Sequence, residues 1–264
     1  MAKPTIVLVP GSFAVPEFYN PVFDAVREKG YDIKGLHLPS VGLRALEGRP
    51  GKPPTMYDDA AHIDKELEKL ADEGKDIVLI GHSYGGVPVS QCGQSLNKEE
   101  RKKQGKSGGL VNLAYLTCLV PGLGQNARDI LAEVPDEHKV DMKVLDDGWM
   151  LHHRPESTAE ICFSSISLEE GTAWVKTFPK HSAVSFVNPL TYAGYKHVPC
   201  SYLLCEQDLC IPASVQQAGI DMIEKESGRK VDVTSIPADH CANITSEKET
   251  IDWIVGLGEK ATTN

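Results

Sequence analysis

A serine flanked by glycines follows directly on an apolar stretch and carries the strongest chemical signal in the chain. Residues 81–85, Gly-His-Ser-Tyr-Gly, have the pattern G-x-S-x-G, between an apolar run at 76–80 and a small-residue helical pattern at 87–96. A nucleophilic serine needs this context, because it sits on a tight strand-to-helix turn where only small neighbours leave room. We therefore predict that Ser83 is a nucleophile, in preference to a purely structural glycine turn.

A serine hydroxyl is a poor nucleophile until a base takes its proton, so a histidine must reach Ser83. Where a serine follows a strand in this way, the chain order is serine, acid, histidine. His240 lies between a strand pattern at 231–236 and the last helical pattern at 246–257. Parallel strands end at one edge of a sheet, so His240 and Ser83 should meet there, and we predict His240 as the base. The other histidines after the motif fall in or near a long insertion: His138, His152, His153, His181 and His197.

The acid that orients the histidine is predicted by the same argument. Asp208 follows the strand pattern that ends at residue 205 and falls in a loop at the same sheet edge. Glu206 lies nearer the strand, Asp239 adjoins the predicted base, and Asp129 follows a different strand, so each is a weaker candidate. In a second interpretation, Asp208 is instead the N-cap of the next helix.

The oxyanion that forms during acyl transfer needs two hydrogen-bond donors. One should be the N–H of Tyr84, directly after the nucleophile. The other should come from the loop after the first strand, Pro-Gly-Ser-Phe at residues 10–13, where Gly11 lets the backbone approach closely. We predict the Ser12 N–H, with Phe13 as the second choice; an ordinary turn is the alternative.

Strand and helix patterns alternate along the chain, which predicts an α/β fold with a mostly parallel sheet and helices on both faces. Residues 39–56, rich in proline and glycine, and the basic stretch 97–109 are expected to be solvated loops. The strand patterns cover residues 5–9, 31–38, 76–80, 110–116, 200–205 and 231–236. The helical patterns cover residues 21–29, 57–71, 87–96, 213–226 and 246–257.

The alternation breaks in residues 121–198, which contain no clear strand but several aromatic residues. We predict a helical cap here, inserted after the strand near Leu116, with residues 1–120 and 199–264 forming the hydrolase core. Surface helices packed on the sheet are the alternative. The substrate pocket is predicted to draw its walls from the oxyanion loop and the cap: Phe13, Trp149, His152, Phe163 and Trp174.

Charge and composition narrow the class of protein. The chain of 264 residues carries 27 Lys and Arg against 37 Asp and Glu, a formal net charge of −10, which argues against binding to nucleic acid or an acidic membrane. No apolar run approaches the roughly 18 residues that span a bilayer, and the N-terminus lacks a signal-peptide pattern. The seven cysteines are scattered without paired spacing, so we expect reduced thiols in a cytoplasmic protein and no metal site.

These patterns together resemble the α/β-hydrolase superfamily from residue 5 to about residue 253. Within it, the chain is similar to the small branch of plant methylesterases, hydroxynitrile lyases and their microbial relatives. The stretches that carry the resemblance are Val-Leu-Val-Pro-Gly at 7–11, Gly-His-Ser-Tyr-Gly-Gly at 81–86, Glu-Gln-Asp at 206–208 followed by Ile211 and Pro212, and Asp-His at 239–240.

The chain departs from that branch at three positions. The oxyanion loop has Pro10 before Gly11 where the branch usually has His-Gly, which alters the pocket wall but leaves the backbone donor. The lyases place a threonine after that histidine and a lysine after the catalytic one, whereas Gly11 and Cys241 stand here. The resemblance therefore disfavours lyase activity. Many microbial relatives have Gly-His-Ser-Pro around the catalytic histidine, whereas residues 239–242 are Asp-His-Cys-Ala, which suggests a specialised pocket.

We predict a serine hydrolase that cleaves a small apolar or aromatic carboxylic ester through an acyl-enzyme, with no metal or organic cofactor. Its partner would be a small-molecule substrate, and a homodimer is left open. Two alternatives remain. The first is other chemistry at the same site: C–C bond hydrolysis, lactone opening or cyclisation of a ketone or polyketide-like metabolite. The second is a non-catalytic ligand-binding protein of the same fold.

Overall fold

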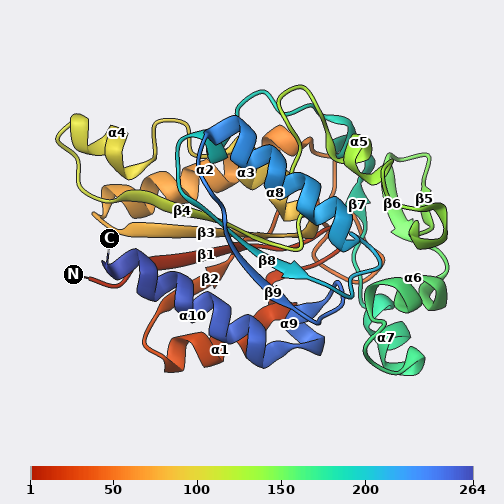
Figure 1. Cartoon of the computed structure of the whole chain (residues 1–264). Coiled ribbons are helices and arrows are strands. Elements are labelled where there is room, and N and C mark those ends of the chain that lie inside the picture. Colours follow the sequence, from red (N-terminus) through yellow and green to blue (C-terminus); the bar gives the residue numbers. More distant parts are fainter. Residues whose placement is uncertain (1, 264) are drawn as a thin grey trace.

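A six-stranded parallel sheet forms the centre of the protein (Figure 1), in a computed structural model that describes residues 2–263. The strand order is β2-β1-β3-β4-β8-β9, so β1 lies next to the edge strand β2 and the later strands follow in sequence order on its other side. This sheet confirms the predicted fold class. Its strands are β1 (Thr5–Val9), β2 (Asp32–Gly35), β3 (Asp76–His82), β4 (Gly109–Leu116), β8 (Cys200–Cys205) and β9 (Asp232–Ile236).

The inner strands β1, β3 and β8 are buried on both faces because helices cover both faces. In β1, Val7 and Val9 pack into one core, and Ile6 and Leu8 pack into the other. This alternation follows from the two-residue period of a strand. Within residues 2–263, no helix combines the length and the apolar character of a membrane span. One face carries α2 (Met56–Asp72), α3 (Gly86–Gln91) and α8 (Ala213–Ser227), and the other carries α1 (Asn20–Glu28), α9 (Ala242–Thr245) and α10 (Glu247–Thr263) (Figure 1).

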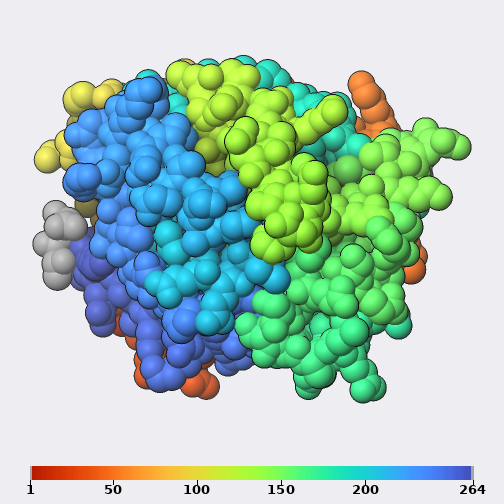
Figure 2. All heavy atoms as spheres, turned by 45° about the vertical axis from the view of Figure 1, so that its right-hand side comes forward, coloured from red at the N-terminus to blue at the C-terminus, as the bar shows by residue number. Residues whose placement is uncertain are grey.

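The chain between β4 and β8 lies at the end of the sheet where β8 ends (Figure 1) and covers much of that face of the molecule (Figure 2). It is not purely helical. The sequence predicts no strand here, but an antiparallel sheet of three short strands lies beside the helices. Strands of two to four residues are too short to show a two-residue period. The elements are α5 (Ala127–Leu131), β5 (Met142–Val144), β6 (Trp149–His152), α6 (Pro155–Cys162), α7 (Leu168–Val175) and β7 (His181–Ser182).

Two other predictions about local structure were wrong. The basic stretch 97–109 contains a helix, α4 (Lys98–Lys103), whose first turn is capped by the Asn97 side chain. Its Arg101 is buried and donates to Asp72, so the stretch is not uniformly solvated. The helix after Ser83 is shorter than predicted, because α3 ends at Gln91 and Gly93 has a left-handed φ of 86°. In both places a capping or turn residue outweighed the composition of the stretch.

Asp59 on α2 is a fully buried carboxylate that ties three segments together. It accepts hydrogen bonds from the Ser40 N–H at 2.8 Å, the Ser40 hydroxyl at 2.6 Å and the Tyr84 hydroxyl at 2.9 Å. Burial raises the pKa of Asp59 to about 6, against the opposing effect of these hydrogen bonds. The carboxyl group is therefore half protonated near pH 6.

We expect Asp59 to make stability fall with rising pH. Its folded pKa lies above the unfolded value, so the folded state binds more protons between about pH 4 and pH 6, and stability is lost as pH rises through that window. A shift of about two units corresponds to about 3 kcal/mol. The free energy of unfolding of Asp59→Asn, minus that of wild type, should therefore increase by about this amount from pH 4 to pH 7 in urea titrations. A pH-independent difference would contradict the assignment.

Candidate active site

Ser83 stands on a strained turn between β3 and α3. It has a left-handed φ of 53°, and residues Ser83–Gly85 form one turn of 3₁₀ helix, η2. A Cβ atom on Gly81 would lie 2.8 Å from Gly85, and one on Gly85 would lie 2.5 Å from the Val9 carbonyl. Both distances are shorter than any side chain tolerates. The glycines of the motif are therefore needed for this turn, which presents the Ser83 side chain at the edge of the sheet.

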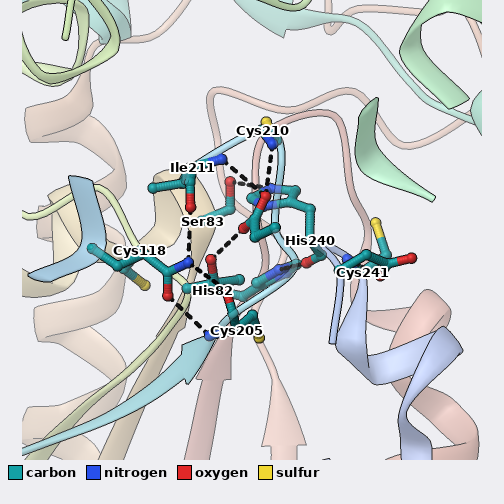
Figure 3. A network of polar contacts seen from close by, with 12 residues as sticks. His82, Ser83, Cys118, Cys205, Cys210, Ile211, His240 and Cys241 are labelled. Atoms are coloured by element: carbon teal, nitrogen blue, oxygen red, sulfur yellow. Dashed lines mark hydrogen bonds and ion pairs between the residues drawn. The ribbon is translucent and has the colours of Figure 1, made fainter. Parts of the chain in front are cut away.

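Three predicted side chains are joined by hydrogen bonds at this edge, where Figure 3 shows Ser83 beside His240. His240, in the loop after β9, has its Nε2 atom 2.9 Å from the Ser83 Oγ atom and its Nδ1 atom 2.7 Å from the Asp208 Oδ2 atom. An ionised carboxylate only accepts hydrogen bonds, so Nδ1 carries the proton and Nε2 accepts from the serine hydroxyl. All three side chains are buried.

Asp208 also changes the pKa of the His240 imidazole. Burial alone lowers the pKa of His240, but the charge of Asp208 and its hydrogen bond raise the pKa well above the ordinary value. Asp208 is itself held by four donors, since its Oδ1 atom accepts the N–H groups of Cys210 at 2.7 Å and Ile211 at 2.9 Å, and Oδ2 also accepts the Thr117 hydroxyl. The carboxylate therefore cannot turn away from the histidine without losing several bonds.

The structure does not support the alternative roles considered for Asp208, Asp239 and Asp129. The N-cap of α8 is Pro212, without a side-chain cap, so Asp208 does not cap that helix. Asp239 has other partners, since it accepts from the Ser165 N–H at 3.0 Å and the Thr245 hydroxyl at 2.6 Å. Asp129 caps α5, far along the chain in the insertion.

The loop after β1 passes close to the serine. A Cβ atom on Gly11 would lie 3.0 Å from the Ser83 Cβ atom, so glycine permits the approach. Phe13 has a left-handed φ of 57°, and its N–H donates to His181 Nδ1 at 3.4 Å. The Ser12 N–H has no hydrogen-bond acceptor within residues 2–263, and Ser12 lines the space in front of Ser83. These contacts favour Ser12 over Phe13 as the second oxyanion donor.

A cavity of about 550 Å³ opens in front of Ser83 and His240. Of the five pocket residues predicted from the sequence, Phe13, His152 and Phe163 line this cavity. Trp149 and Trp174 do not: the Trp149 ring packs against Gly48, and the Trp174 ring packs edge-on against Phe18, which lines the cavity in its place. The composition of the insertion indicated apolar walls, but it could not show which aromatic side chains turn inward.

His152 is a polar group in this apolar wall. Its ring packs against Phe13 with centroids 4.2 Å apart, and its Nδ1 atom lies 3.1 Å from the Thr158 hydroxyl. Burial, with a smaller contribution from His153, lowers the pKa of His152 to about 4, so the ring is neutral near pH 7. A neutral imidazole can accept or donate one hydrogen bond to a bound molecule without carrying charge.

The chain matches known proteins along nearly its whole length. A model of the alpha/beta hydrolase family matches residues 6–253. The chain belongs to the alpha/beta hydrolase family. A relative named "Probable hydrolase R7", from Phoma sp., is 30% identical over 257 residues, which cover 97% of this chain and 99% of the relative. The resemblance to the superfamily seen in the sequence is thereby confirmed.

Solved structures of other alpha/beta hydrolases share the fold. A pyrethroid hydrolase from Sphingobium faniae JZ-2 superposes with a TM-score of 0.73 at 20% identity, over 99% of each chain. Polyneuridine aldehyde esterase superposes with a TM-score of 0.71 at 14% identity, over 97% of this chain and 99% of that chain. At these identities the likeness is one of fold, and the substrate of this hydrolase must be argued from its own residues.

A second series of hydrogen bonds, which the sequence did not reveal, lies next to the site of this hydrolase. The Tyr19 hydroxyl lies 2.6 Å from His82 Nδ1, and the Gly11 N–H lies 3.4 Å from the same hydroxyl. His82 Nε2 lies 2.9 Å from the backbone carbonyl of His240. That carbonyl only accepts, so Nε2 carries the proton and Nδ1 accepts from Tyr19. Burial lowers the pKa of His82 to about 3, which keeps the ring neutral in this arrangement.

These hydrogen bonds connect the loop after β1, the turn at Ser83 and the loop of His240. Tyr19 should therefore act as a positioning residue. We expect Tyr19→Phe to lower kcat about tenfold with KM changed less than about twofold, because only the alignment of groups around Ser83 is disturbed. Tyr115→Phe is the matched control, since it removes a buried hydroxyl bonded to Ser90. Equal losses in both variants, or a loss confined to KM, would rule out a positioning role.

Proposed function

We propose that this member of the family is a serine hydrolase that cleaves carboxylic esters through an acyl-enzyme. The observation that carries the proposal is the unbroken hydrogen-bonded chain from Ser83 through His240 to Asp208 at the end of an apolar cavity. A hydroxyl, a neutral imidazole and a buried carboxylate in this order form the arrangement that activates serine for attack on a carbonyl carbon.

In the first half of the reaction, the Ser83 Oγ atom bonds to the ester carbonyl carbon while its proton passes to His240 Nε2. The N–H groups of Ser12 and Tyr84 stabilise the negative oxygen of the tetrahedral intermediate. His240 then returns the proton to the departing alkoxide, and the alcohol leaves. In the second half, water attacks the acyl group, His240 takes the proton of that water and returns it to Ser83, and the carboxylic acid is released. Asp208 balances the charge of His240 in both halves.

The substrate should be apolar or aromatic, and small enough for a cavity of about 550 Å³. Leu131, Val140, Phe163 and Phe186 contribute apolar wall, so binding would be driven by removal of apolar surface from water. His152 is a polar group in that wall that can orient a carbonyl or hydroxyl of the substrate.

The test combines turnover with covalent labelling. Wild-type protein is incubated with short-chain and aryl p-nitrophenyl esters, and release of the phenolate is followed. A fluorophosphonate probe is added in parallel, and the labelled peptide is identified by mass spectrometry. We expect turnover and a single label on Ser83.

Each other outcome has a definite meaning. Labelling of Ser83 without ester turnover would contradict the esterase and leave C–C cleavage, cyclisation or ligand retention at the same nucleophile. Absence of both would contradict Ser83 as an active nucleophile and favour a non-catalytic ligand-binding protein.

A further inference from the structure

The charged side chains that line the cavity in front of Ser83 are all basic. Among residues 2–263, no aspartate or glutamate lines it, although the chain contains 37 of them and has a formal net charge of −10. Its lining does include Arg128 and Lys139, with His138 beside them. All three come from the chain that follows β4, which lies at the surface of the face shown in Figure 2. One part of an otherwise apolar cavity is therefore basic.

Three carboxylates of the same segment have hydrogen-bond partners of their own. Asp129 accepts the Asn126 N–H at 3.0 Å and caps α5. Asp141 accepts from the Arg154 Nε atom at 2.7 Å, and Asp136 accepts from Lys139 Nζ at 2.5 Å. None of these three carboxylates lines the cavity, although the partner of Asp136, Lys139, does.

Arg128 and His138 each have hydrogen-bonding atoms that could bind a ligand. Among residues 2–263, no carboxylate lies within ion-pair distance of the Arg128 guanidinium, whereas Lys139 shares its charge with Asp136. The Nδ1 atom of His138 is buried and has no hydrogen-bond partner among the same residues. A buried ring nitrogen without a partner costs free energy, and a rotation of the ring that brought this nitrogen to a ligand oxygen would remove that cost.

We propose that this basic part of the cavity binds a free carboxylate of the substrate, with Arg128 as its main contact and His138 as a second donor. The inference rests on the proposed function and narrows it. The natural ester would carry a second, unesterified carboxyl group, separated from the scissile carbonyl by an apolar segment. Such a molecule is a half-ester of a dicarboxylic acid, or an ester of an apolar acid with a second acid group.

The chemistry of the site favours a carboxylate. The guanidinium offers paired N–H donors in a plane that matches the two oxygens of a carboxylate. Leu131, Val134 and Val140, from the same segment, supply apolar wall beside the basic group. A net charge of −10 would repel an anionic substrate in general, so a local basic lining is what would draw the anion into the cavity.

The test uses p-nitrophenyl half-esters of α,ω-dicarboxylic acids of increasing length, each paired with the same molecule methylated at the far carboxyl. A second series carries the free carboxylate on the alcohol side of the scissile bond. For wild type, kcat/KM should favour the free acid over its methyl ester by about tenfold at one preferred length, and the preference should shrink with added salt. Arg128→Gln should abolish the preference, because it should lower the rates for the free acids far more than the rates for their methyl esters.

Arg154→Gln is the matched control, because it removes one arginine charge from the same insertion at a site that does not line the cavity. The control should keep the wild-type preference. The inference is overturned if wild type turns over neutral esters and shows no preference at any length, or if Arg128→Gln lowers the rates for both members of a pair equally. Failure to turn over any ester, with Ser83 unlabelled by fluorophosphonate, would instead overturn the proposed function.

Discussion

Replacing Ser83 by alanine is expected to lower kcat/KM for p-nitrophenyl esters by about a millionfold, to the level of the remaining oxyanion donors. The hydroxyl is the atom that forms the acyl bond, and no other hydroxyl lies at hydrogen-bonding distance from the Nε2 atom of His240 within residues 2–263. Alanine is also an L-residue, so the left-handed φ of 53° costs the variant no more than it costs the wild type. The loss should therefore be chemical and not a consequence of unfolding.

Ser90→Ala is the matched control for this prediction. Ser90 is a buried serine on α3, and its hydroxyl donates to the Gly86 carbonyl at 2.7 Å without contacting the substrate cavity. We expect Ser90→Ala to retain activity within a few-fold of wild type, and thermal unfolding should show both variants folded. Substantial turnover by Ser83→Ala, or a fluorophosphonate label at another residue in that variant, would contradict Ser83 as the nucleophile.

The fold and the central side chains were predictable because their signals are local. The apolar run at 5–9 and the G-x-S-x-G turn at 81–85 each determine their own conformation, since a buried strand must be apolar and the turn excludes Cβ atoms. The positions of His240 and Asp208 then followed from a rule of parallel sheets, that successive strands end at one edge. The rule applies however far apart these residues are in the sequence.

The remainder of the site depends on contacts between segments far apart in sequence, which leave no local pattern. Tyr19 and His82 are 63 residues apart and meet only in the folded state. Thr117, which donates to Asp208, could have been suspected from its position directly after β4, at the same sheet edge as the nucleophile. Trp149 and Trp174 were placed in the pocket by composition alone, and composition does not set the direction of a side chain.

Replacing Asp208 by asparagine is expected to lower kcat about ten-thousandfold while leaving the fold intact. The reason lies in its four donors. The N–H groups of Cys210 and Ile211 require an acceptor, so the amide oxygen of asparagine must face them and the NH₂ group must face His240. His240 Nδ1 then has to accept, which moves the ring proton to Nε2. That nitrogen can no longer take the proton of Ser83.

The pH dependence of the same variant gives an independent measurement. In wild type, activity needs neutral His240, and the carboxylate of Asp208 raises the pKa of His240 above 6.5, so activity should be lost as pH falls through that raised value. Asparagine carries no charge, and the residual activity of Asp208→Asn should therefore fall off at a lower pH. Asp239→Asn is the control, because it neutralises the adjacent buried carboxylate, which bonds Ser165 and Thr245 and not the imidazole. A loss in Asp239→Asn as large as in Asp208→Asn, or an unshifted acid limb in Asp208→Asn, would contradict Asp208 as the group that orients and charges His240.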